Sequence, residues 1–248
     1  MSQEILDRLQ RVDRILDGEP LVPKDAATLL ILERKADGDP HVLMGRRHMR
    51  HKFMPGMFVF PGGRVDPEDV GVRFAADYDP TVQSKLTRDL KGEEEEDYTR
   101  AFAIAAVRET YEEAGLFIGR LDHNDTEPCG HGFEAFDSRF VMPDLSPMRF
   151  IARAITPPGR PRRYDTRFLA VWADQIADRL PEGTGPSGEL EELQWLSLEE
   201  SKQLELPPIT LAVIEELQNR LAEDPKLEPD YPVPYYYWTP EGFVREEL

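Results

Sequence analysis

The stretch RETYEEAGL, residues 108–116, places three glutamates, Glu109, Glu112 and Glu113, at spacing i, i+3 and i+4. Residues three and four apart are neighbours on a helix surface, so in a helix these carboxylates share one face. The preceding run AFAIAAV is rich in alanine and has no glycine or proline, which favours a helix. Gly115 suits a left-handed C-terminal cap. We therefore predict a helix that ends at a cluster of carboxylates.

The same helix carries a second stripe beside its acidic face. Its members are small and recur at helical spacing, which predicts close packing against a sheet: Ala103, Ala106, Val107, Thr110 and Ala114. Crowded carboxylates repel one another, and a hard divalent cation would offset that repulsion because Mg²⁺ takes oxygen ligands. Arg108, one turn before Glu112, can brace it by a charge-assisted hydrogen bond. The alternative is an acidic face that is only solvated.

Upstream of this helix, residues 60–66 read FPGGRVD, a strand end that runs into a glycine pair where backbone can approach a ligand closely. Together the two stretches resemble the signature of the Nudix hydrolase family, G-x5-E-x7-R-E-U-x-E-E-x-G-U, where U is a bulky aliphatic residue. Gly63 matches the opening glycine. The closing half is matched by six residues: Arg108, Glu109, Glu112, Glu113, Gly115 and Leu116.

This chain departs from the signature in two places. Arg108 follows Gly63 by 45 positions (108 − 63), where the signature has 14, so about 31 residues are inserted, and we assign the insertion to 66–98. Thr110 replaces the first bulky aliphatic residue. The middle glutamate of the signature falls at Glu68 or Asp69, and the sequence leaves both open.

The resemblance implies an α/β fold, the Nudix-type α/β/α sandwich with a mixed β-sheet, and a site for Mg²⁺ or Mn²⁺. It implies that Glu112 and Glu113 are metal ligands and that Glu109 is a ligand or supports the catalytic base. It also implies that Gly63 offers a backbone carbonyl to the metal and that Arg108 is structural to the site.

Nudix enzymes often bring one more glutamate from a loop distant in sequence, which makes Glu189 and Glu192 candidates here. Either would complete the metal site or act as the base, and the sequence does not choose between them. The alternative for both is ordinary surface charge.

Composition bounds the function further. The chain has 48 acidic and 30 basic residues and a formal net charge of −18, which argues against general nucleic-acid binding. A single cysteine, Cys129, provides no internal disulfide and suits a reducing compartment, so we expect a cytoplasmic protein. We find no apolar run long enough to span a bilayer and no signal-peptide pattern, so we expect no membrane partner.

Periodicity and turn residues outline the rest of the chain. We predict an N-terminal helical extension (1–24), a Nudix domain (25–222) and an aromatic, proline-rich tail (223–248) that packs on the domain or on a second subunit of a homodimer. Strands are predicted at 26–32, 41–45, 57–60, 116–118, 149–155, 168–173 and 190–196. Helices are predicted at 1–18, 81–90, 198–204 and 209–221, and long polar loops at 119–147 and 181–189.

Two basic segments stand out in this acidic chain: residues 46–52 (RRHMRHK) and 159–163 (GRPRR). We predict that they bind the anionic substrate, since arginine forms charge-assisted hydrogen bonds with phosphates. The candidates are Arg46, Arg50, Lys52, Arg163 and Arg167. The alternative for both segments is a solvated basic turn.

The runs around these segments add a finer resemblance. ITPPGRPRRYDTRFLAVWA and RRHMRHKFMPGMFVFPGG are similar to stretches of the Nudix branch that includes peroxisomal coenzyme A diphosphatases, although the second basic position falls at His51 or Lys52. The resemblance implies hydrolysis of the diphosphate linkage in a nucleoside diphosphate derivative, with coenzyme A or an acyl-coenzyme A as candidates. The alternative from another class is a Nudix-fold module that binds a nucleotide without cleaving it.

Overall fold

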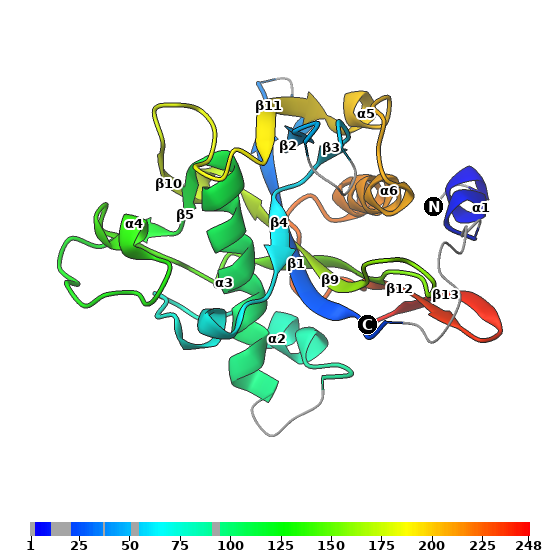
Figure 1. The fold of residues 1–248 in the computed structure, drawn as a ribbon, viewed down its shortest axis with the longest axis horizontal. Coiled ribbons are helices and arrows are strands. Elements are labelled where there is room, and N and C mark those ends of the chain that lie inside the picture. Colours follow the sequence, from blue (N-terminus) through cyan, green and yellow to red (C-terminus); the bar gives the residue numbers. More distant parts are fainter. Residues whose placement is uncertain (1–2, 11–20, 37, 51–54, 91–94) are drawn as a thin grey trace.

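The computed structural model describes residues 3–10, 21–36, 38–50, 55–90 and 95–248. Within these residues, a mixed nine-stranded sheet forms the centre, with the order β11-β2-β1-β9-β8-β12-β13 and with β3 and β4 paired to β2 and β1 (Figure 1). The parallel pairs are β1 with β9 and β8 with β12. The strands are β1 (Lys24–Arg34), β2 (Pro40–Arg47), β3 (Phe58–Val59), β4 (Gly62–Arg64), β8 (Arg149–Ile155), β9 (Tyr164–Trp172), β11 (Leu190–Ser197), β12 (Pro234–Thr239) and β13 (Gly242–Glu247).

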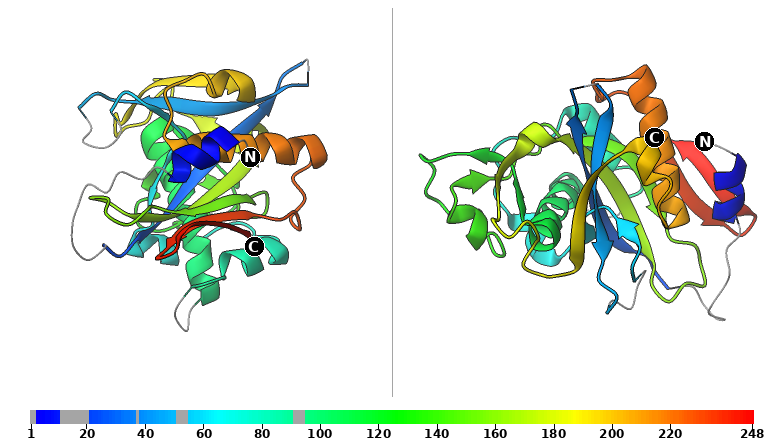
Figure 2. Two further views of the ribbon diagram at one scale, coloured as in Figure 1. Left: turned by 90° about the vertical axis from the view of Figure 1, so that its right-hand side faces the viewer. Right: turned by 90° about the horizontal axis from the view of Figure 1, so that it is seen from above.

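Helices cover both faces of this sheet, as Figure 2 shows from above. On one face lies α3 (Glu95–Ala114), and on the other lies α6 (Pro208–Glu223) with α5 (Leu198–Ser201) and α1 (Gln3–Gln10) nearby. Side chains of β1 alternate between the two cores, because successive residues of a strand face opposite ways. Leu29 and Ile31 join the core under α3, whereas Leu30 and Leu32 join the core under α6. The predicted α/β sandwich with a mixed sheet is confirmed.

Helix α3 packs on the sheet through its stripe of small residues. The exposed fraction of every member is 1% or less: Ala103, Ala106, Val107, Thr110 and Ala114. Thr110, which stands where the family signature has an aliphatic residue, donates its hydroxyl to the Ala106 carbonyl at 2.7 Å. The threonine therefore occupies this buried position without an unsatisfied polar group.

Residues 119–147, predicted as a polar loop, form a packed lobe instead. The lobe contains β6 (Arg120–Leu121), α4 (Glu134–Asp137) and β7 (Val141–Met142), and it lies beside β5 (Leu116–Ile118), η2 (Ala173–Gln175) and β10 (Ile176–Arg179). Phe133 and Phe136 are fully buried, and their rings pack against each other with centroids 4.9 Å apart. These aromatic contacts link the lobe to the core under α3.

The C-terminal residues, predicted as an extended tail, form a hairpin that continues the central sheet. Strand β12 pairs in parallel with β8, and β13 pairs with β12. The segment that follows Asp69 contains the end of η1 (Pro67–Gly71) and α2 (Pro80–Leu86), and it is attached to this hairpin. Arg88 forms an ion pair with Glu246 at 2.9 Å, and Lys85 donates to the Tyr231 carbonyl at 2.6 Å.

Residues 11–18 of the predicted N-terminal helix lie outside the described residues, while residues 3–10 are helical as α1. In the part of the chain that the structure describes, no helix has the length and apolar character needed to cross a bilayer.

Candidate functional site

The three glutamates lie together in the last two turns of α3. The side chain of Glu113 is 3% exposed, that of Glu109 is 17% exposed and that of Glu112 is 40% exposed. This end of the helix carries the negative end of the macrodipole, and its last turn has no basic residue. Gly115 adopts φ +69° directly after the helix, as its capping role predicted. The position is therefore unfavourable for anionic side chains unless a cation compensates them.

Strand β4 brings the glycine pair against these carboxylates. The Gly62 N–H donates to Glu113 Oε2 at 3.0 Å. A Cβ atom at Gly63 would lie 2.2 Å from Glu109 Oε1, so a side chain at this position would displace the carboxylate. Both glycines thus allow the backbone of β4 to lie directly on the acidic face of α3.

The register of β4 changes one expectation. The Leu29 N–H donates to Pro61 O and the Val65 N–H donates to Asp25 O, so the intervening pair Ala27–Gly63 is of the hydrogen-bonded type. The Gly63 carbonyl consequently faces β1 and is not the one directed at α3. The N–H and C=O of Gly62 point away from β1 toward Glu113, which makes Gly62 the better candidate for a backbone ligand.

Arg108 connects the glutamates of α3 to Asp69 and to strand β4. Its guanidinium forms two hydrogen bonds with Asp69, Nε to Oδ1 at 2.9 Å and Nη2 to Oδ2 at 3.0 Å, and Nη2 also donates to the Arg64 carbonyl. Nη1 donates to Glu109 at 3.0 Å and to Glu112 at 3.4 Å. Burial alone would lower the pKa of Arg108, but the bonds from Asp69 raise it above its ordinary value. Arg108 therefore stays charged and orients two of the three glutamates.

Asp69, with 2% exposure, is the partner of Arg108, whereas Glu68 is exposed. We predict that Asp69→Ala lowers the free energy of unfolding by about 3 kcal/mol, because it removes the buried carboxylate that accepts two hydrogen bonds from the Arg108 guanidinium. Chemical denaturation measures this change, with Glu68→Ala as the matched control on the neighbouring residue. Equal effects of the two variants would contradict the assignment.

A loop distant in sequence is attached to the same end of α3. The Gly185 N–H donates to the Glu113 carbonyl and the Ser187 N–H donates to the Glu112 carbonyl. Glu189 then forms an ion pair with Arg47 at 2.9 Å, and the same guanidinium lies 3.9 Å from Glu113. The sequence left Glu189 and Glu192 open, and the loop brings Glu189 toward the carboxylates.

Glu192 points elsewhere, because it pairs with Arg46 at 3.2 Å. Arg47 is the residue that sequence reasoning missed: it belongs to the basic run 46–52, but only its strand position turns it toward Glu113. Strand alternation from the buried Leu43 gave a signal for this orientation.

Burial makes the charged forms of these carboxylates unfavourable. It raises the pKa of Glu113 to about 8, and repulsion from Glu109 and Glu189 adds to this, against the Gly62 N–H and Arg47. Burial likewise raises the pKa of Glu109 to about 7, against the lowering effect of Arg108. Among the described residues no three acidic, histidine or cysteine side chains are already gathered as a metal cluster. The donor set nevertheless fits Mg²⁺ or Mn²⁺, since it offers several neighbouring carboxylate oxygens, the ligand type that these ions prefer.

These shifts predict how stability depends on pH. A carboxyl whose pKa is higher in the folded than in the unfolded state favours folding while it is protonated, so its contribution is lost as pH rises from about 4.5 to about 8. We expect the melting temperature in EDTA to fall across this range, and to fall less in Glu113→Gln. Mg²⁺ should raise the melting temperature more at pH 8 than at pH 6. Parallel pH profiles for the two proteins would contradict this assignment.

The predicted basic substrate residues separate in the structure. Arg46 lies beside Glu192 on β11, and Arg50 donates to the Gly188 carbonyl in the preceding loop at 3.2 Å. Arg163 lines a surface cavity, and Lys52 lies outside the described residues.

Arg167 requires a correction. Its side chain is only 1% exposed, pairs with Asp25 and Asp165, and stacks 4.1 Å from the ring of Phe102. It lies on the face of the sheet that α3 covers, because it shares that face of β9 with Leu169. Arg167 is therefore a structural residue and is left out of the substrate site.

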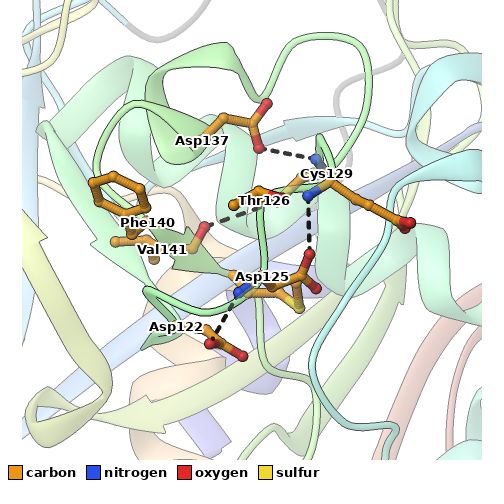
Figure 3. A pocket seen from close by; sticks show the side chains of 9 residues that line it. Asp122, Asp125, Thr126, Cys129, Asp137, Phe140 and Val141 are labelled. Carbon is orange, nitrogen blue, oxygen red and sulfur yellow. Dashed lines mark hydrogen bonds between the residues drawn. The ribbon is translucent and has the colours of Figure 1, made fainter.

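A small cavity of about 130 Å³ in the 119–147 lobe is lined by acidic residues around Cys129 (Figure 3). Its carboxylates are already bonded: Asp137 accepts from the Cys129 N–H, and Asp125 accepts from the Glu127 N–H and pairs with Arg73. Burial raises the pKa of the Cys129 thiol to about 12, so the thiol is neutral and unreactive.

No family model matches the chain. A Nudix hydrolase from Alicyclobacillus acidocaldarius is similar, with 27% identity and a TM-score of 0.58, over 78% of this chain and 90% of that one. RenU, a Nudix hydrolase from M. smegmatis, shows 18% identity and a TM-score of 0.44, over 84% and 97%. An Ap4A hydrolase from C. elegans shows 16% and 0.40, over 80% and 99%.

The first of these similarities extends over most of both chains, and it includes sequence identity as well as a shared topology. Fold and site together define an α/β/α sandwich in which a helix bearing carboxylates lies against a glycine-containing strand. The chain thus has the fold of the Nudix hydrolases, and its likeness to the A. acidocaldarius enzyme supports a Nudix diphosphate hydrolase.

Proposed function

We propose that the chain is a Mg²⁺- or Mn²⁺-dependent hydrolase that cleaves the diphosphate linkage of a nucleoside diphosphate derivative. The observation that carries the proposal is the acidic end of α3 lying on the glycine pair of β4, where burial raises the pKa of Glu109 and Glu113 despite the nearby Arg108 and Arg47. A divalent ion bound there would neutralise the diphosphate and lower the pKa of a bound water.

The chain's own residues have distinct roles in this proposal. Glu112 and Glu113 would hold the metal together with the Gly62 carbonyl, and Glu109 would be a further ligand or support the base. Glu189 is the candidate for the additional carboxylate, held by Arg47 at 2.9 Å. Catalysis would then rest on positioning and on charge neutralisation of the phosphates.

Arg108 would act by positioning alone, because Asp69 engages two of its nitrogens and its remaining bonds go to the Arg64 carbonyl, Glu109 and Glu112. The contact with Asp69 also supports the assignment of Asp69 to the middle acidic position of the signature. In that case the inserted residues lie between Asp69 and Arg108, somewhat later than 66–98 at their start.

The finer proposal is that coenzyme A or an acyl-coenzyme A is the substrate. It rests on the resemblance of segments 46–63 and 155–173 to the coenzyme A diphosphatase branch. Arg47 belongs to the first segment and lies 3.9 Å from Glu113, where its guanidinium would contact a phosphate bound at the carboxylates. The alternative is a nucleotide-binding module without turnover, but a pure binder has no need of three clustered carboxylates.

A hydrolysis panel tests the proposal. Coenzyme A, an acyl-coenzyme A, NADH, ADP-ribose and a dinucleoside polyphosphate are incubated with Mg²⁺, with Mn²⁺ or with EDTA. We expect metal-dependent cleavage of at least one diphosphate. Cleavage of another diphosphate but not of coenzyme A compounds would remove the finer proposal. Absence of turnover, with a nucleotide still raising the melting temperature, would favour the binding module.

A further inference from the structure

A surface cavity of about 560 Å³ lies at the N-terminal ends of β1 and β9, on the far side of β4 from the carboxylates. Four cationic side chains line it: Lys24, Arg64, Arg162 and Arg163. Tyr164 and the 86% exposed Val22 supply aromatic and apolar surface beside them. Its volume is in the range of small-molecule sites.

The charge of this cavity opposes that of the chain. In a protein of net charge −18, no carboxylate side chain is among the described residues that line it. Arg163 is bound to backbone carbonyls, Nε to Thr156 O at 2.9 Å and Nη1 to Leu21 O at 2.6 Å, which fix its guanidinium without neutralising it. Arg64 has a loose ion pair with Asp66 at 3.7 Å, and its side chain is 52% exposed. The cavity is therefore a local positive patch that can attract an anion.

The backbone connects this cavity to the candidate metal centre. Arg64 follows Gly63, and adjacent side chains of a strand face opposite ways, so Arg64 projects away from Glu109. Ala26 pairs with Arg64 and Lys24 pairs with Tyr164, which places all four residues on one face of the sheet. The cavity and the carboxylates are therefore on opposite faces of the sheet and are connected through two consecutive residues of the short strand β4, Gly63 and Arg64.

We propose that this cavity binds a phosphate monoester on the substrate, remote from the diphosphate that is hydrolysed at the carboxylates. The inference rests on the proposed function. Several separate cations suit a dianion better than a single carboxylate, and arginine forks match phosphate oxygens. The remaining volume, with Tyr164 and Val22, accommodates the sugar and base that carry the phosphate.

Matched substrate pairs test the cavity: coenzyme A with dephospho-coenzyme A, and NADPH with NADH, each pair differing by one ribose phosphate. We expect the wild-type kcat/KM to favour the phosphorylated member by about tenfold, mainly through KM, as for one or two charge-assisted contacts. Lys24→Gln/Arg162→Gln should lose most of this preference. The matched control, Lys226→Gln/Arg179→Gln, removes the same charges from exposed sites elsewhere. Equal kcat/KM within both pairs, or equal loss for both members, would overturn the proposal.

A binding measurement separates this proposal from the proposed function. If no diphosphate is cleaved with Mg²⁺ or Mn²⁺, the proposed function fails, and calorimetry in EDTA compares adenosine 3′,5′-bisphosphate with adenosine 5′-monophosphate. Tighter binding of the bisphosphate, abolished in Lys24→Gln/Arg162→Gln, would support the cavity on its own. Equal binding of the two nucleotides would overturn it.

Discussion

Glu112→Gln is expected to lower kcat by about 10²-fold or more, comparable to the loss of one strong electrostatic contact in an active site. The substitution keeps the size of the side chain and removes its charge. Glu112 is 40% exposed, and its ion pair with Arg108 in the described structure is long at 3.4 Å, so the change removes little from the fold. We therefore expect the melting temperature in EDTA to stay close to that of the wild-type protein while turnover is lost.

Steady-state kinetics with Mg²⁺ on the best substrate of the panel measure this effect. Glu215→Gln, on α6 across the sheet, is the matched control and should retain wild-type turnover. Near-wild-type kcat in Glu112→Gln would remove Glu112 from the metal site. Loss of turnover together with loss of Mg²⁺-induced stabilisation would support its role as a ligand.

The acidic helix is the part of the site that sequence predicts best, because it depends on local spacing. The i, i+3, i+4 glutamates need only a helix to lie on one face, and Gly115 ends that helix in the left-handed conformation as expected. The contacts of Asp69 and Arg47 depend on tertiary structure, so the sequence left Asp69 open beside Glu68 and did not single out Arg47.

The missed elements have physical reasons too. The 119–147 segment is rich in turn and polar residues, and its structure depends on Phe133 and Phe136 reaching the core under α3. The C-terminal hairpin was not predicted, because the prolines of this segment favour an extended tail. Gly242 nevertheless forms the turn between its two strands, with φ +136°. In contrast, the position of Arg167 had a local signal. It shares its strand face with Leu169, and this period of two predicts an inward side chain.

The second large effect on turnover is expected at Gly63, the residue of β4 that faces Glu109. Gly63→Ala is expected to lower kcat by about 10²-fold or more, because the new methyl group would lie 2.2 Å from Glu109 Oε1 and 2.3 Å from Glu109 Cδ. Atoms cannot approach this closely, so the Glu109 carboxylate must move away from β4, and a displacement of about 1 Å is enough to cost about 10²-fold in rate. The metal centre would lose a correctly placed carboxylate without any change in its charge.

The fold should tolerate this substitution better than catalysis does. The atoms in the way belong to the end of a flexible side chain and not to backbone, and Gly63 does not need a positive φ. We expect Gly63→Ala to remain folded, with Mg²⁺ raising its melting temperature less than that of the wild type. Gly71→Ala is the matched control, because a Cβ there meets nothing within 4 Å. Full activity in Gly63→Ala would show that Glu109 need not occupy the place where β4 meets α3, and would leave the metal centre to Glu112, Glu113 and Glu189.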